Sequence, residues 1–389
     1  MAVIFILAII ALPLVATFVF IAEMVAGIAP ARRRPVPDCT GQRVTILMPA
    51  HDEAEILGDI LDRLAPEIDG WATVVVIADN CVDETADVGR LRGATVVERS
   101  DPTRRGKGFA LDHGRNYLRS DPPEVVIVLD ADCTSDRASL RALAASAVTW
   151  NRPCQAINLI KPLVGSPPLV ELSNFAFMIK NLVRQRGLQR LTGRTRLVGT
   201  GMAFPWPIFD RAPLATDNIV EDVELGLALD RAGTPPQLVT DARNWSDPSS
   251  TSGTLIQRTR WEGGFLALAK AKAPLAIGHA VRRLDPRALI AALDLCVPPL
   301  TLLAITDGAV LVLAAAATLM LATAWWPVLL FLATLIAAIV LVAIAWAREG
   351  RQFIRARTLA RIPLYVLWKI PLYLGLARRG AGDWARPGR

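Results

Sequence analysis

The chain has 389 residues, of which 52% are hydrophobic and 20% charged, and its mean hydropathy is +0.37. It is too apolar for an ordinary soluble protein and too charged for a chain of membrane spans only, so a soluble domain joined to membrane segments is predicted. The net charge of +7 would suit a nucleic-acid partner, but the basic residues flank apolar stretches, which indicates membrane orientation and no nucleic acid.

An apolar run opens the chain at residues 2–26 and contains Pro13 and a single acid, Glu23. Nothing basic precedes the run and an arginine cluster at 32–34 follows it, so a retained transmembrane anchor over residues 1–30 is favoured over a cleaved signal peptide. Because basic residues mark the cytoplasmic end of a span, the N-terminus is predicted to lie outside and the chain after the cluster in the cytoplasm.

From residue 43 onward, short β-rich runs alternate with helical patterns, as in a parallel α/β sheet. The predicted strands cover residues 44–48, 73–77, 94–97 and 125–129. Helical patterns between them cover residues 55–64 and 108–118. Open α/β sheets bind ligands at the carboxyl edge of their strands, where acidic residues stand in this sequence. A cytoplasmic nucleotide-binding α/β domain is therefore predicted over residues 43–280.

Two later apolar runs, residues 300–323 and 326–346, are each long enough to cross ~30 Å of hydrocarbon. They are predicted to form two spans within residues 300–347, which makes three in all. Asp307 in the first of them requires a polar partner or a position near the membrane interface. Two spans return the chain to the cytoplasm, where the basic tail at 348–389 belongs.

Two other apolar segments are poor spans. Residues 287–297 are short and contain an acid, and residues 359–376 are interrupted by prolines and a lysine. Both are predicted to lie in the membrane interface as helices, the first within residues 281–299 and the second within the basic tail.

Asp130 and Asp132 form the sharpest chemical feature, because a run of five apolar residues precedes them and only one residue separates them. Two carboxylates leaving one strand end suit Mg²⁺ or Mn²⁺, which prefers oxygen ligands and would also hold a substrate diphosphate. The alternative is a solvated turn, since this short pattern often occurs by chance.

Other motifs at strand ends strengthen the metal and nucleotide interpretation. Glu53 follows the first predicted strand, and Asp79 ends the second, where it would contact a base or ribose. Asp83 in the same loop is suited to capping the next helix. Lys107 lies between two glycines at a helix start, where a cation favours a phosphate; a solvated basic turn is its alternative.

Two later motifs contain residues that would act on the acceptor and the leaving group of a transfer reaction. Glu221 and Asp222 stand before a helical pattern, where their charge would stabilise the helix N-terminus through its dipole. Asp222 would also serve as the general base for an acceptor hydroxyl, and the two roles are compatible. In the sequence Gln257-Arg-Thr-Arg-Trp261, Arg260 would neutralise a leaving diphosphate and Trp261 would stack on a sugar. The alternative is an ordinary interfacial helix with snorkelling side chains.

Taken in order, these motifs resemble the inverting family-2 glycosyltransferases. They read ADNCVDET (78–85), GKG (106–108), LDAD (129–132), VEDVELG (220–226) and QRTRW (257–261). The set is most similar to the membrane-embedded branch with the QxxRW signature, which includes cellulose, hyaluronan and chitin synthases and ceramide glucosyltransferases. The resemblance covers about residues 43–264 and is specific for the superfamily, not for the sugar.

The resemblance implies a GT-A-like α/β domain on a membrane base and a role for each matching residue. It implies donor contacts by Glu53, Asp79, Lys107, Asp130 and Arg260, metal binding by Asp132, and catalysis by Asp222. It also implies acceptor or signature positions at Gly201, Met202, Glu221, Gln257 and Trp261.

The implied reaction transfers a hexose, with inversion, from a nucleotide diphosphate such as UDP to a lipid or lipid-linked oligosaccharide. It would serve surface polysaccharide or glycolipid assembly at the inner membrane, with assembly proteins as further partners. One alternative is a processive polysaccharide synthase, which three spans argue against because the familiar synthases have more. Another is a non-catalytic assembly subunit, which the intact acid set argues against. The motifs depart from the family at Val220, where threonine is common, and at Asn80-Cys81, where Asp-Gly is usual.

Overall fold

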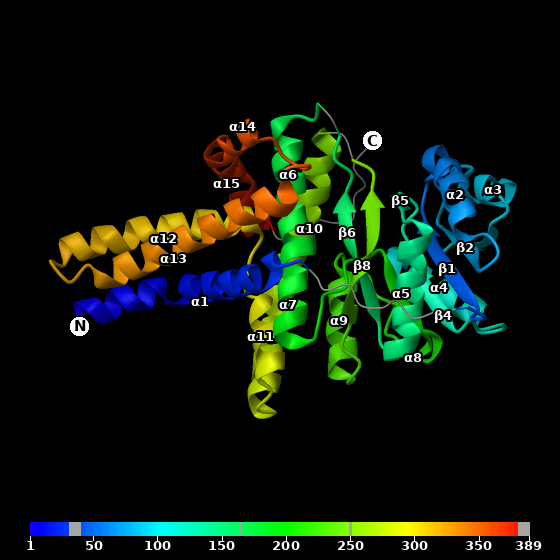
Figure 1. The fold of residues 1–389 in the computed structure, drawn as a ribbon, viewed down its shortest axis with the longest axis horizontal. Coiled ribbons are helices and arrows are strands. Elements are labelled where there is room, and N and C mark those ends of the chain that lie inside the picture. The colour runs from blue at the N-terminus through cyan, green and yellow to red at the C-terminus, as the bar shows by residue number, and fades with distance from the viewer. Residues whose placement is uncertain (31–39, 164, 249–250, 380–389) are drawn as a thin grey trace. The chain divides into compact units, whose positions relative to one another are not determined.

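The computed structural model describes residues 1–30, 40–163, 165–248 and 251–379 (Figure 1). Contacts within the chain divide it into two compact units. The sheet unit consists of Ala31–Lys161 and Arg194–Asp247, and the helical unit of Met1–Pro30, Pro162–Gly193 and Pro248–Arg389. Residues of the predicted domain 43–280 therefore occur in both units.

The sheet unit contains eight described strands in the order β3-β2-β1-β4-β7-β6-β8-β5. Their bounds are β1 Val44–Ala50, β2 Ala72–Asp79, β3 Thr95–Arg99, β4 Val125–Val128, β5 Cys133–Thr134, β6 Cys154–Ile160, β7 Met202–Pro205 and β8 Gln237–Ser246. The first four strands match the four predicted runs and pair in parallel. The prediction of a parallel sheet is wrong beyond β4, because β7 pairs antiparallel with both β4 and β6.

Helices cover the sheet on both faces. They are α2 Ala54–Ile68, α3 Thr85–Leu91, α4 Lys107–Leu118, α5 Arg137–Trp150, α8 Trp206–Arg211 and α9 Glu221–Arg231. Alternate residues of β1 explain the two layers: Ile46 joins one buried cluster with Leu57 of α2, and Leu47 joins another with Leu111 of α4. A strand buried on both faces is apolar at successive positions, which is why the run was recognisable in the sequence.

The helical unit contains the apolar segments. Its elements are α1 Ala2–Ile28, α6 Pro168–Met178, the π-helix η1 Ile179–Arg184, α7 Gln185–Thr192, α10 Thr251–Arg282, α11 Pro286–Asp294, α12 Leu300–Met320, α13 Trp326–Ala345, the π-helix η2 Trp346–Gly350, α14 Ala356–Leu359 and α15 Ile362–Arg379. Among the residues that the structure describes, three helices are long and apolar enough to cross a membrane: Ala2–Ile28, Leu300–Met320 and Trp326–Gly350. These are the three predicted spans, and α1 continues through Pro13.

The three apolar helices α1, α12 and α13 contact one another within this unit (Figure 1). Thr17 Oγ1 of α1 donates a hydrogen bond of 2.8 Å to Asp307 Oδ2 of α12, and both side chains are buried. The polar partner expected for Asp307 is therefore Thr17. The single acid of α1, Glu23, accepts a hydrogen bond of 2.6 Å from Arg184 Nε. Each acid thus has a polar partner, as buried charge in a membrane helix requires.

Candidate active site

The acids predicted at strand ends come together at one edge of the sheet. Asp79 is the last residue of β2, and Asp130 follows β4 by two positions. Both strands pair in parallel with β1, so their carboxyl ends reach the same edge. Glu53, which follows β1, donates its backbone N–H to Thr85 Oγ1 at 2.7 Å. This edge is where the sequence placed the nucleotide site.

Asp79 has a charged partner that the sequence patterns did not identify. Arg99 Nη1 donates to Asp79 Oδ1 at 2.5 Å, and the two side chains are 10% and 8% exposed. Arg99 ends β3, and in the parallel register it stands opposite Asp79. Aligning the ends of the second and third predicted strands would have suggested the pair.

Asp83, in the loop after Asp79, has the helix-capping role expected of it. Its carboxylate accepts hydrogen bonds from the backbone N–H groups of Thr85, at 3.0 Å, and Ala54, at 3.1 Å. One side chain therefore satisfies backbone donors at the starts of both α3 and α2, where such groups lack partners within the helix.

The Lys107 side chain bonds both to Asp130 and to the loop before β7. Its ammonium forms an ion pair with Asp130 and donates to the carbonyl oxygen of Gly199 at 2.7 Å. Gly106 makes this position possible because its φ of 127° lies in a region that other residues avoid. A Cβ atom on Gly108 would collide with the backbone oxygen of Leu214, so both glycines of the motif are needed.

The loop from Gly199 to Gly201 also touches the acids. Thr200 Oγ1 accepts a hydrogen bond of 3.1 Å from the backbone N–H of Asp130. A Cβ atom built on Gly199 would lie 3.5 Å from both Lys107 Nζ and Asp222 Oδ2, so Gly199 borders both groups. This loop contains Gly201, a predicted acceptor position. It thus lies beside both Lys107, which is predicted to bind the sugar donor, and Asp222, the predicted base.

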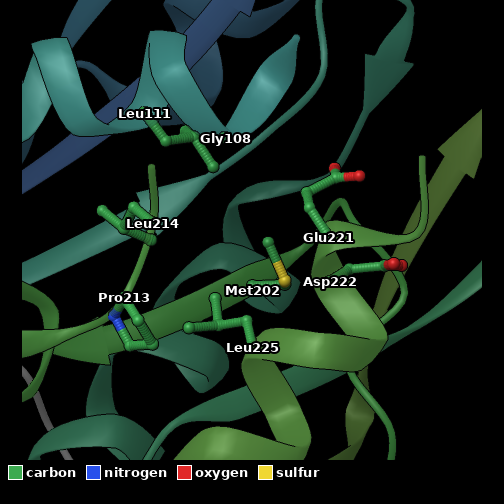
Figure 2. Close-up of a pocket in the computed structure, with 8 residues that line it drawn as sticks. All are labelled: Gly108, Leu111, Met202, Pro213, Leu214, Glu221, Asp222 and Leu225. Carbon is green, nitrogen blue, oxygen red and sulfur yellow. The ribbon is translucent and has the colours of Figure 1, made fainter. Parts of the chain in front are cut away.

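Glu221 and Asp222 lie in the first turn of α9 and line a pocket with apolar walls. Figure 2 shows their carboxylates pointing in different directions from the helix, with Leu225 one turn further on. The remaining lining residues are Gly108, Leu111, Met202, Pro213 and Leu214. Met202 is buried, and it contributes to this wall from the first position of β7.

Burial and neighbouring charges shift the pKa values of two groups in this site, Glu221 and Lys107. Burial, followed by the negative charge of Asp222, raises the pKa of Glu221 to about 8. Glu221 is therefore protonated more readily than an ordinary glutamate. Burial opposes the charge on Lys107, but the three nearby carboxylates outweigh this effect and raise the pKa of the ammonium. The site thus holds a persistent positive charge where a phosphate would need one.

Asp130 and Asp132 have the arrangement that a hard divalent cation requires. Oxygens of both carboxylates and Cys133 Sγ lie within 4.8 Å of one another. Burial raises the pKa of the Cys133 thiol well above its ordinary value. The two carboxylates offer oxygen donors, which fit Mg²⁺ or Mn²⁺. The ammonium of Lys107 already provides a positive charge beside Asp130.

The signature residues Gln257, Arg260 and Trp261 belong to α10 and hence to the helical unit. Trp261 stacks on Phe177 of α6, with ring centroids 6.0 Å apart. Trp261 therefore packs against a residue of its own unit. That the signature residues act together with the acids at the sheet edge stays a prediction.

Replacing Lys107 by methionine should weaken binding of a metal–nucleoside diphosphate complex by roughly 10- to 100-fold, because charge-assisted hydrogen bonds contribute about 1.5–3 kcal/mol. Binding to the purified protein can be measured by calorimetry. Arg92→Met is the control, because it removes a cation from an exposed pair with Asp62 in the same unit. Unchanged affinity in Lys107→Met would remove this side chain from the donor site.

Comparisons with known proteins agree with this geometry. A glucosyl-3-phosphoglycerate synthase of Mycolicibacterium paratuberculosis is 31% identical over 98 residues, which is 24% of this chain and 29% of that protein. An uncharacterized protein of Methanocaldococcus jannaschii is 29% identical over 89 residues, 23% of this chain and 35% of that protein. The chain therefore matches about a third of the length of these curated relatives.

A solved mannosyltransferase from Pyrobaculum calidifontis, in complex with GDP-mannose and Mn²⁺, aligns with 95% of this chain and 100% of its own. The TM-score is 0.56 and the sequence identity 20%, so this likeness concerns the fold, which is GT-A-like as predicted. The model of the glycosyltransferase-like family 2 matches residues 41–264, more than half of the chain. With the acids of that family gathered at one sheet edge, the chain belongs to the glycosyltransferase-like family 2.

Proposed function

We propose that this protein is a membrane-bound, metal-dependent glycosyltransferase that moves a hexose from a nucleotide diphosphate to a lipid or lipid-linked saccharide. The observation that carries the proposal is the group formed by Lys107, Asp130 and Asp222, with Gly199 bordering both Lys107 and Asp222. It combines a cation for phosphate, a carboxylate for a divalent metal and a second carboxylate for a proton, which are the functions that sugar transfer requires.

The proposed reaction is a single displacement at the anomeric carbon. The acceptor oxygen forms the new bond to this carbon as the bond to the β-phosphate oxygen breaks. Asp222 accepts the proton of the acceptor hydroxyl. The electron pair of the broken bond leaves with the nucleoside diphosphate. Attack from the opposite side inverts the configuration, so an α-linked donor gives a β-linked product.

Positive charge near the leaving group lowers the energy of the transition state because negative charge develops there. Lys107 is placed for this role beside Asp130. Asp130 and Asp132 would hold Mg²⁺ or Mn²⁺, which when bound would add Lewis-acid stabilisation of the diphosphate. Asp79, with Arg99, would orient the nucleoside at the end of β2.

A lipid acceptor is proposed because the same chain carries three helices that could cross a membrane. Such an acceptor would stay in the membrane while its hydroxyl enters the catalytic site. UDP-hexoses are the first donors to test, and GDP-mannose the second, because the Pyrobaculum enzyme was solved with it. The product would contribute to surface polysaccharide or glycolipid assembly at the inner membrane.

The direct test incubates the purified protein with Mn²⁺, a panel of nucleotide sugars and a membrane lipid extract. One nucleotide sugar should give both free nucleotide and a labelled lipid, and NMR of the product should show a β-linkage. Failure of every donor to label a lipid would contradict the proposal. A long polymer in place of a single added sugar would support a processive synthase instead.

The N-terminus should lie outside the cytoplasm and the C-terminus inside, because the arginines at 32–34 and 348–357 flank the spans. Reporters that work on only one side of the membrane can be fused to each end. A variant with the arginines at 32–34 replaced by glutamine should show mixed orientation. A cytoplasmic N-terminus in the unmodified chain would contradict the three-span arrangement.

A further inference from the structure

The end of the QRTRW signature is fixed by contacts inside the helical unit. Arg258, one of the variable positions of the signature, places its guanidinium 4.3 Å from the ring centroid of Phe177 and 5.1 Å from that of Trp261. Its Nε donates to Ser173 Oγ of α6 at 3.0 Å. The buried Arg258 guanidinium therefore contacts both the Trp261 ring and the Phe177 ring on which Trp261 stacks, and these contacts restrict the orientation of Trp261.

The next residue, Glu262, ties the same helix to α15. Lys369 Nζ donates to Glu262 Oε1 at 2.7 Å, and Tyr373 Oη donates to Glu262 Oε2 at 2.7 Å. The Lys369 side chain is only 2% exposed. Both carboxylate oxygens of Glu262 are thus occupied by donors from one face of α15, one helical turn apart.

The opposite face of α15 is apolar and exposed. It carries Leu364, Leu367 and Trp368, which are 69%, 61% and 45% exposed. An ordinary surface helix buries its apolar face, but α15 buries its lysine and exposes its leucines. A lysine is almost never fully buried unless it is paired, and here the pair is with the residue that follows Trp261. The inward face of α15 therefore supplies two polar contacts to the signature helix, and α15 also packs against α12 and α6.

We propose that Lys369 and Tyr373 are positioning residues for the transferase signature. By holding Glu262 through two hydrogen bonds, they fix the end of the signature on α10 and so the orientation of the Trp261 ring. The catalytic consequence rests on the proposed function, because Trp261 acts on a sugar only if the protein transfers one. The orientation itself does not depend on that function.

Orientation can be measured without turnover by labelling the full-length protein in detergent with 5-fluorotryptophan. Loss of a signal in Trp261→Phe assigns the resonance of residue 261. We expect this resonance to shift or broaden in Lys369→Met and, less strongly, in Tyr373→Phe, which removes only a hydroxyl group. Lys270→Met is the matched control, because it removes a charge from an exposed position of α10. An unchanged resonance in both test variants would overturn the proposal.

Turnover then shows whether the two residues act through Trp261. Misplacement of a catalytic element by about 1 Å costs up to 10²-fold, so kcat in Lys369→Met should fall by roughly 10- to 100-fold, while nucleotide affinity is kept. Tyr373→Phe should lose about 2- to 10-fold, and Lys369→Arg should recover part of the rate. In a Trp261→Ala background, Lys369→Met should cost little more.

An equal loss from Lys369→Met in both backgrounds would show an effect that does not pass through Trp261, and would overturn the proposal. If the wild-type protein transfers no sugar, the proposed function fails. The fluorine resonance still decides whether α15 orients the signature.

Discussion

Asp222→Asn should bind the donor nucleotide nearly as the wild-type protein does and transfer sugar about 10²–10⁴-fold more slowly, because a positioned general base contributes that much to proton transfer. Asparagine keeps the shape of the side chain and its capacity to accept from the Val223 N–H, a hydrogen bond of 2.8 Å in the wild type. It loses the basicity. Nucleotide affinity by calorimetry and single-turnover transfer rates separate these two properties.

Two neighbouring acids provide controls for this variant. Asp230→Asn changes an acid on the same helix, α9, which pairs with Arg194 at 3.0 Å, and it should leave transfer nearly unchanged. Glu221→Gln should have a smaller effect at pH 7 than Asp222→Asn, because burial and the charge of Asp222 raise the pKa of Glu221 to about 8. Wild-type turnover in Asp222→Asn would show that another group is the base. Loss of nucleotide binding would instead place Asp222 in the donor site.

The sequence predicted the first half of the sheet well because β1, β2 and β4 contain continuous apolar runs. Val125–Val128, for example, is buried at every position, and nothing but a strand of a covered sheet explains four such residues before Asp130. β7, Met202–Pro205, is as short and as buried as β4, but it contains no β-branched residue and ends in a proline. β8 mixes polar and apolar positions over Gln237–Ser246. Their antiparallel and long-range pairing leaves no local pattern, so the mixed character of the sheet was not predicted.

The acids of the site were predictable one by one, but their partners were not. Asp130 was found from its place after a strand, whereas its pairing with Lys107 depends on how α4 packs on the sheet. The carbonyl of Gly199 that accepts from the same ammonium is 92 residues away in the sequence. Spacing rules describe neighbours on one strand or helix, and contacts across elements are set by tertiary packing.

Asp132→Asn should lower sugar transfer on the order of 10²–10³-fold, because metal coordination supplies several kcal/mol of charge stabilisation to the departing diphosphate. EDTA should stop transfer by the wild-type protein, and Mn²⁺ or Mg²⁺ should restore it. Asp87→Asn, at an exposed acid of α3, should behave like the wild type in both assays. Full transfer in excess chelator would remove the metal from the mechanism.

A substitution at Asp132 tests the metal requirement more specifically than one at Asp130. Removing the carboxylate of Asp130 would also leave the partly exposed ammonium of Lys107 without its ion-pair partner, which lowers stability. Asp130→Asn would therefore lose metal, nucleotide and stability together. Asp132→Asn should leave the unfolding midpoint close to that of the wild type and weaken only Mn²⁺-dependent nucleotide binding. If nucleotide affinity in Asp132→Asn still rose with Mn²⁺ as it does in the wild type, the metal would be bound elsewhere.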